Sequence, residues 1–228
     1  MTQIPAPFDM PAEDLAALLC ARLCHDLVAP VSAINTALEV MEDESAVDMR
    51  DEALKLLHLS AGQASAKLEF ARIAFGAGTS APGMVATREL ERLVTGAFTS
   101  SRSEIVWRVT ASHLSKAASR LLLNMVILGV EAALRGGEVH IEAASASRMR
   151  VCVRGGMSKL LPTVSTALEG KAMENGYDGR SIQPFYTGLI ARSLGGRTEA
   201  RVLDDGVEFT ALTEEEACEM IGTRAQAV

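Results

Sequence analysis

Residues 22–31 read Arg-Leu-Cys-His-Asp-Leu-Val-Ala-Pro-Val and lie inside a long stretch with the apolar periodicity of a helix. His25 is followed at once by an acid, and Pro30 comes five residues after it. A proline inside a helix removes one backbone donor and clashes with the preceding turn, so we expect the helix to bend near residues 26–30. The bend predicts an imidazole that a partner can reach.

A helical wheel at about 100° per residue divides residues 19–41 into two faces. The large apolar side chains fall together, roughly opposite His25: Leu19, Leu23, Leu27, Ile34, Leu38 and Met41. The residues around His25 are mostly small or polar: Arg22, Ala29, Ser32, Ala33, Thr36 and Val40. His25 is therefore expected to project from a smooth strip on which another helix can lie. A surface histidine without a role is the plain alternative.

The side chains beside His25 suit nucleophilic chemistry. A neutral imidazole is a good nucleophile near neutral pH because one ring nitrogen is unprotonated. The carboxylate of Asp26 can accept a hydrogen bond from the other ring nitrogen, which fixes the tautomer and stabilises the cation formed on attack. Arg22, one turn earlier, could offset the charge of a phosphoryl group. We therefore predict His25 and Asp26 as catalytic residues, with Arg22 and Pro30 in support; an N-cap or simple ion pair is the alternative for Asp26.

The run His-Asp-Leu-Val-Ala-Pro-Val at 25–31 resembles the phosphoacceptor motif of sensor histidine kinases. In that family a second helix pairs with the first, and two such hairpins dimerise into a four-helix bundle. Here an acidic connection at 41–46 precedes a second apolar-periodic stretch, which Asp48 can cap and which continues to about Phe75. Narrow apolar stripes on both arms cannot be buried by one hairpin, so we expect a homodimer.

The rest of the chain predicts an α/β sandwich that resembles the kinase ATP-binding domain. Helices are expected at 86–98, 115–135, 162–169 and 181–194, and strands at 104–110, 138–144, 148–154, 197–203 and 207–213. Asp204-Asp205-Gly206 predicts a hairpin turn between the last two strands. The fold class is therefore α+β, a helical hairpin followed by this sandwich. The expected parts are a flexible tail at 1–10, a hairpin dimerisation and phosphotransfer domain at 11–77, a linker at 78–87 and a degenerate kinase-like domain at 88–228.

The resemblance fails at the positions that bind nucleotide in kinases. Leu128 aligns with the metal-chelating asparagine, and Arg154-Gly155-Gly156-Met157 stands where an acidic adenine loop is expected. Gln183-Pro184-Phe185-Tyr186 occupies the place of the glycine-rich lid. Leucine cannot bind magnesium, and bulky side chains block the approach of backbone to phosphates. We therefore expect this chain to bind no ATP, no metal ion and no other cofactor.

A kinase-like acceptor helix on a body without ATP-binding residues resembles the histidine phosphotransferases of the alphaproteobacterial cell-cycle phosphorelay. The resemblance covers nearly the whole chain and includes residues 21–26, 48–51 and 72–77. It implies that a phosphoryl group moves from the receiver aspartate of a hybrid kinase to His25 and then to aspartates of response regulators. Magnesium is then expected on the receiver rather than on this chain.

The resemblance also implies where a receiver docks. The first helix of the receiver is expected along the strip beside His25, on Ala29, Ser32, Ala33, Thr36, Ala37 and Val40. The resemblance implies that Ala33, Thr36, Ala37 and Val40 determine which receiver binds. Two other functions stay open. One is a non-catalytic pseudokinase scaffold that docks receivers or kinases, and the other is an active kinase with divergent nucleotide motifs.

The composition of the chain argues against some classes of partner. The 228 residues carry a net charge of −7, and 4% of them are aromatic, which argues against binding nucleic acid. No apolar run of transmembrane length and no signal peptide are recognised, so we expect a cytoplasmic protein without a membrane partner. Cys20, Cys24, Cys152 and Cys218 lack the spacing of a metal motif and are expected to be buried, reduced thiols.

Overall fold

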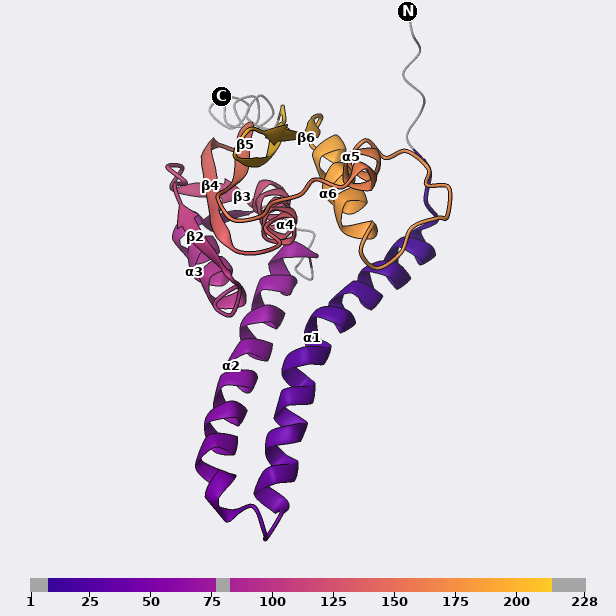
Figure 1. The fold of residues 1–228 in the computed structure, drawn as a ribbon. Helices are drawn as coiled ribbons and strands as arrows, with labels where there is room; N and C mark the ends of the chain where they lie inside the picture. The colour runs from indigo at the N-terminus through magenta and orange to yellow at the C-terminus, as the bar shows by residue number, and fades with distance from the viewer. Residues whose placement is uncertain (1–7, 77–82, 215–228) are drawn as a thin grey trace, which may run out of the picture.

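The computed structural model describes residues 8–76 and 83–214 and shows a helical hairpin followed by an α/β domain (Figure 1). The hairpin consists of α1 (Ala12–Glu42) and α2 (Arg50–Ala74), with a 3₁₀ turn, η1 (Val47–Met49), in their connection. Asp48 lies within η1, and α2 begins after Met49, so the prediction that Asp48 caps this helix is wrong. The predicted α+β fold class is confirmed.

Small side chains hold the two arms of the hairpin close together. Pro30 and Ala37 are buried on α1, and Ala53 and Ser60 are buried on α2. Large apolar side chains of both arms stay on the surface: Val28, Val31, Leu38, Leu54, Leu56, Leu59 and Leu68. The single chain therefore leaves an apolar surface on its hairpin, as the narrow stripes in the sequence predict.

The two halves of α1 pack on different partners. Figure 1 shows α1 beside α2 near the hairpin connection and curving away from α2 toward the α/β domain, while the helix itself continues unbroken through Pro30. Leu15, Leu18 and Leu19 of its first half pack against a buried cluster formed by α5 (Pro162–Leu168) and α6 (Ile182–Ser193). The α/β domain is thereby docked on the hairpin.

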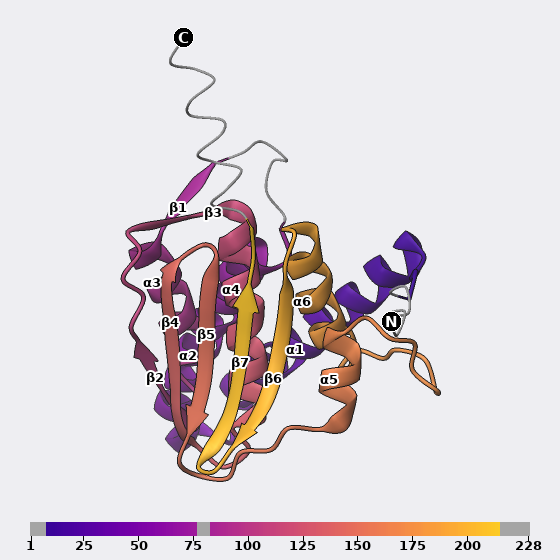
Figure 2. The same ribbon diagram turned by 90° about the horizontal axis from the view of Figure 1, so that it is seen from above.

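A five-stranded sheet forms the second layer of that domain, in the order β2-β4-β5-β7-β6. The strands are β2 (Ser103–Trp107), β4 (Gly137–Ser145), β5 (Arg148–Arg154), β6 (Arg197–Leu203) and β7 (Gly206–Leu212). β2 and β4 are parallel, and every other pair is antiparallel. Figure 2 shows the helices behind one face of this sheet. Leu203 pairs with Gly206, so Asp204 and Asp205 form the two-residue turn that the sequence predicts.

The core lies between the sheet and helices α3 (Thr87–Ala97), α4 (Lys116–Ala132) and α6. Most of α4 is buried, because it lies between the sheet and the other helices. A close approach at Gly129 makes this possible: a Cβ there would lie 2.6 Å from Val151 Cγ1 of β5.

Several predicted boundaries are wrong. A short antiparallel pair, β1 (Met84–Ala86) with β3 (His113–Ser115), was not predicted, and β1 occupies part of the expected linker at 78–87, of which 78–82 lie outside the described residues. The strand expected at 104–110 ends at Trp107.

Residues 1–7 of the expected flexible tail lie outside the described part of the chain. Phe8 belongs to that tail and is partly exposed, but its N–H donates to the Gly170 carbonyl at 2.6 Å, and its ring lies beside those of Tyr177 and Phe185.

Two expectations from composition also need correction. By length and composition α1 could span a membrane, with 31 residues and a mean hydropathy of 1.5 over its most apolar window, contrary to the prediction that no such run exists. A charged group at the centre of a spanning helix is costly, and α1 carries Arg22 and Asp26 near its middle.

Cys20 and Cys24 are exposed rather than buried, whereas Cys152 is buried; Cys218 lies outside the described residues.

Candidate functional site

His25 projects from the middle of α1, and 69% of its side chain is exposed. Its Nδ1 atom lies 3.2 Å from Oδ1 of Asp26. A carboxylate can only accept hydrogen bonds, so this contact assigns the ring proton to Nδ1 and the lone pair to Nε2. The contact leaves a lone pair on Nε2, and the exposure of the side chain agrees with the expectation that His25 projects from the helix.

Asp26 is fixed through both its side chain and its main chain. Its Oδ1 meets His25, and its Oδ2 accepts a hydrogen bond from Arg22 Nε at 3.0 Å. Its carbonyl oxygen accepts from Lys67 Nζ of α2, also at 3.0 Å. In a regular helix that carbonyl would accept from the N–H of residue 30, and Pro30 has none. The proline thus frees a carbonyl that the neighbouring helix then uses.

Arg22 is placed differently from the expectation. Only 6% of the residue is exposed. Its Nη2 contacts Glu131 Oε1 of α4 at 2.5 Å, while its Nε contacts Asp26. Burial lowers the pKa of Arg22, but the charges and hydrogen bonds of Glu131 and Asp26 outweigh this and raise it. The prediction that Arg22 offsets the charge of a phosphoryl group is therefore wrong, because its guanidinium forms ion pairs with Asp26 and Glu131 inside the protein.

Glu131 belongs to the α/β domain and was not predicted from the sequence. Burial raises the pKa of its carboxyl group, and the charge of Arg22 opposes the rise. Since 42% of the side chain is still exposed and a guanidinium lies at 2.5 Å, we assign Glu131 as ionised at neutral pH. Lys67 was missed as well. Pro30 signals an unpaired carbonyl at Asp26, but nothing in the sequence says which side chain fills it.

The predicted docking strip is narrower than the sequence indicates. Ala29, Ser32 and Thr36 are exposed, and Ala33 and Val40 are half-buried. Ala37 is only 1% exposed, because it is one of the small residues that α1 packs inside the hairpin. Ala37 therefore offers no surface to a partner, and its prediction as a docking residue is wrong on that point.

Two of the three places that stand for the kinase nucleotide site, Leu128 and the segment 183–186, are buried, whereas residues 154–157 are exposed. Leu128 is 3% exposed. The Asn124 side chain donates to the carbonyls of Ala74 and Arg120, both at 2.7 Å, and accepts from Gln183 Nε2 at 2.6 Å. The segment 183–186 forms the buried first part of α6. The paired amide of Asn124 and the buried apolar side chains do not fit ATP or its metal ion, although Oε1 of Gln183 has no hydrogen-bond partner among the described residues.

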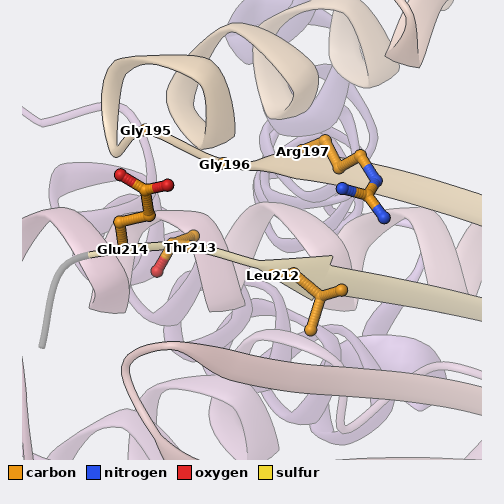
Figure 3. Close-up of a pocket in the computed structure, with 6 residues that line it drawn as sticks. All are labelled: Gly195, Gly196, Arg197, Leu212, Thr213 and Glu214. Carbon is orange, nitrogen blue, oxygen red and sulfur yellow. The ribbon is translucent and has the colours of Figure 1, made fainter.

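The α/β domain also has a hollow on its surface, away from His25. It has a volume of about 250 Å³ and lies where α6 ends and β6 begins, against the end of β7. Figure 3 shows the side chains of Glu214 and Arg197 at opposite ends of it. Its lining residues are Gly195, Gly196, Arg197, Leu212, Thr213 and Glu214, so none of the residues around His25 takes part.

Comparisons with known proteins agree with the fold. Residues 87–206 match the family model described as histidine phosphotransferase C-terminal domain. The protein phosphotransferase ChpT of Brucella abortus (strain 2308) is 37% identical over 208 residues, which are 90% of this chain and 98% of that protein. A bacterial phosphotransferase solved at 1.7 Å is 34% identical, with a TM-score of 0.80 over 91% of this chain and all of the other. These similarities support a phosphotransferase activity in two-component signalling. The chain belongs to the histidine phosphotransferase family.

Proposed function

We propose that this protein is an intermediate of a two-component phosphorelay. It takes a phosphoryl group from the receiver aspartate of a hybrid histidine kinase onto His25 and passes it to aspartates of response regulators. The observation that carries the proposal is the exposed imidazole of His25, whose Nδ1 is held by Asp26 so that Nε2 is free. Family membership supports the same chemistry.

The reaction is a transfer between a nitrogen and a carboxylate oxygen. The Nε2 lone pair of His25 attacks the phosphorus of the receiver's aspartyl phosphate. The P–N bond forms while the P–O bond to the aspartate breaks, and the aspartate leaves as a carboxylate. The ring then carries a positive charge, which Asp26 stabilises through Nδ1–H. Delivery to the second receiver is the reverse of these steps, so the protein contributes mainly positioning and electrostatics.

The proposed transfer needs magnesium but no nucleotide. We expect Mg²⁺ on the carboxylates of the partner receiver, where it neutralises the oxygens of the moving phosphoryl group. We expect no ATP on this chain. The packed state of Leu128 and the paired amide of Asn124 support this expectation.

The proposed assembly is a cytoplasmic homodimer in which two hairpins form a four-helix bundle, with neither nucleic acid nor membrane as a partner. Its support is the apolar surface on both arms of the hairpin, where Leu59 is 73% exposed and Leu38 is 42% exposed. Surface of this kind is the packing face of helix bundles.

A non-catalytic scaffold is the alternative function. A scaffold needs a docking surface, but it does not need a nucleophile held in one tautomer. The contact between His25 and Asp26 therefore favours phosphotransfer over docking alone.

A relay assay with purified proteins tests the proposal. A labelled, phosphorylated receiver is mixed with this protein, a second receiver and Mg²⁺, without nucleotide. We expect acid-labile label on this protein and then label on the second receiver. Tight binding of the receiver with no label on this protein would favour the scaffold. Labelling of His25 by ATP alone would identify a kinase.

A further inference from the structure

Three consecutive contacts connect His25 to the α/β domain. Asp26 Oδ1 lies 3.2 Å from His25 Nδ1, Asp26 Oδ2 lies 3.0 Å from Arg22 Nε, and Arg22 Nη2 lies 2.5 Å from Glu131 Oε1. Only the last contact crosses from the hairpin to α4. The far end of this series is therefore a carboxylate of the domain that has lost the kinase nucleotide site.

We propose that Glu131 is a positioning residue for phosphotransfer at His25, acting through Arg22 and Asp26. The proposal rests on the phosphorelay function above and assigns to the degenerate domain a part in the acceptor site. Glu131 does not reach the phosphoryl group itself. It determines how Arg22 engages Asp26, and Asp26 in turn holds the imidazole.

The geometry of the guanidinium explains this role. An arginine with a single carboxylate partner tends to bind it through both oxygens. In this structure the Nη2 end of Arg22 is occupied by Glu131, and only Nε reaches Asp26. Asp26 Oδ1 is therefore left for His25. Without Glu131, the buried guanidinium would take both oxygens of Asp26 and remove the acceptor that fixes the ring tautomer.

The negative charge of Glu131 should also favour transfer to His25. Arg22, Asp26 and Glu131 together carry one net negative charge, and His25 becomes a cation when it accepts the phosphoryl group. Loss of Glu131 would leave this group neutral, and the phosphorylated ring would lose part of its stabilisation. Arg22 would also keep only one partner while buried, which is unfavourable for a cation.

The domain is held firmly enough to place Glu131. The amide of Asn124, also on α4, donates to the Ala74 carbonyl at the end of α2. The first half of α1 packs on α6 at the same time. Besides the ion pair between Arg22 and Glu131, the hairpin is thus linked to the α/β domain through α4 and through α6. Asn124 thereby helps to hold α4, which carries Glu131, against the hairpin.

Single-turnover transfer from a phosphorylated receiver tests the proposal. At saturating receiver, we expect Glu131→Ala to slow transfer about 10-fold or more, because small misplacements of a reacting group can cost about 10²-fold. The dissociation constant of the receiver should stay unchanged. Glu131→Gln, which keeps an acceptor oxygen, should fall between Glu131→Ala and the natural protein. Glu142→Ala is the matched control, since Glu142 pairs with Arg150 on the sheet, and it should transfer at the normal rate.

A double variant separates positioning from a general structural effect. In an Asp26→Asn background, Glu131→Ala should slow transfer much less than it does in the natural background, because Glu131 acts mainly through Asp26. Independent, multiplicative losses would overturn the proposal, as would full-rate transfer by Glu131→Ala. Nitrogen-15 NMR gives a readout that does not depend on transfer: the share of His25 with its proton on Nδ1 should fall in Glu131→Ala. An unchanged tautomer would also overturn it. Failure of the natural protein to accept label would instead contradict the phosphorelay function.

Discussion

Lys67 of α2 donates a hydrogen bond to the main-chain carbonyl of Asp26 in α1, with 3.0 Å between Nζ and the oxygen. That carbonyl is available because Pro30, which occupies the position of its usual donor, lacks an N–H. A residue that interrupts the hydrogen bonds of one helix thereby creates a contact between two. The contact lies in the turn that carries His25 and Asp26, so it fixes the backbone beneath the proposed acceptor.

Lys67→Met should show the value of this contact. Methionine keeps much of the aliphatic stem but leaves the Asp26 carbonyl without its donor. We expect the free energy of unfolding to fall by roughly 1 kcal/mol and transfer to slow several-fold. Lys55→Met is the control, because Lys55 pairs with Glu52 on the exposed surface. Chemical denaturation and single-turnover transfer measure both effects. Equal behaviour of the two variants would mean that the contact does not support the site.

Asp26→Asn should slow transfer on the order of 10²-fold, because the amide keeps the size of the side chain but removes the charge that holds Nδ1–H. Binding of the receiver should change much less. Rapid-quench kinetics and a direct binding measurement separate these effects. If affinity and rate fell by the same factor, Asp26 would be a docking residue instead.

Thr36→Tyr and Ala37→Leu should have different consequences although the residues are adjacent. Thr36 is exposed, so a bulky side chain there should weaken transfer to some receivers while thermal stability is kept. Ala37 is buried, so Leu should overpack the hairpin, cost about 1–3 kcal/mol and impair all receivers alike. Ala33→Tyr should resemble Thr36→Tyr. A receiver-selective loss at Ala37 with normal stability would contradict the docking surface described here.

Leu38→Glu should weaken the homodimer. The side chain is 42% exposed in the single chain, and burying a charge there in a four-helix bundle is unfavourable. We expect sedimentation velocity to show a shift toward monomer. Leu134→Glu changes an exposed leucine outside the hairpin and should leave the dimer intact. A dimer unaffected by Leu38→Glu would place the interface elsewhere.

The secondary structure could be predicted largely because its signals are local. Alternating residues at 148–154 and the turn at Asp204-Asp205 specify strands without knowledge of the rest of the chain. β1 and β3 were missed because three residues are too few to show a period. Their pairing is instead a long-range contact that the sequence pattern does not display.

The site could be predicted only where its residues are neighbours in the sequence. His25 and Asp26 are adjacent on one helix, so their contact follows from helical geometry. A wheel assumes one packed face along the whole helix, but α1 packs on α2 in one half and on the α/β domain in the other. This difference explains the unexpected burial of Arg22. Glu131 and Lys67 reach the site from other helices, and only the fold brings them there.

The most direct test of the central claim is the transfer of label from a phosphorylated receiver to His25→Gln, with Mg²⁺ and without nucleotide. His58→Gln is the matched control, because His58 is an exposed histidine on α2. We predict that the natural protein and His58→Gln take up acid-labile label at similar rates, and that His25→Gln, folded and dimeric, takes up none. Label on His25→Gln at the normal rate would contradict the proposal that this histidine accepts the phosphoryl group.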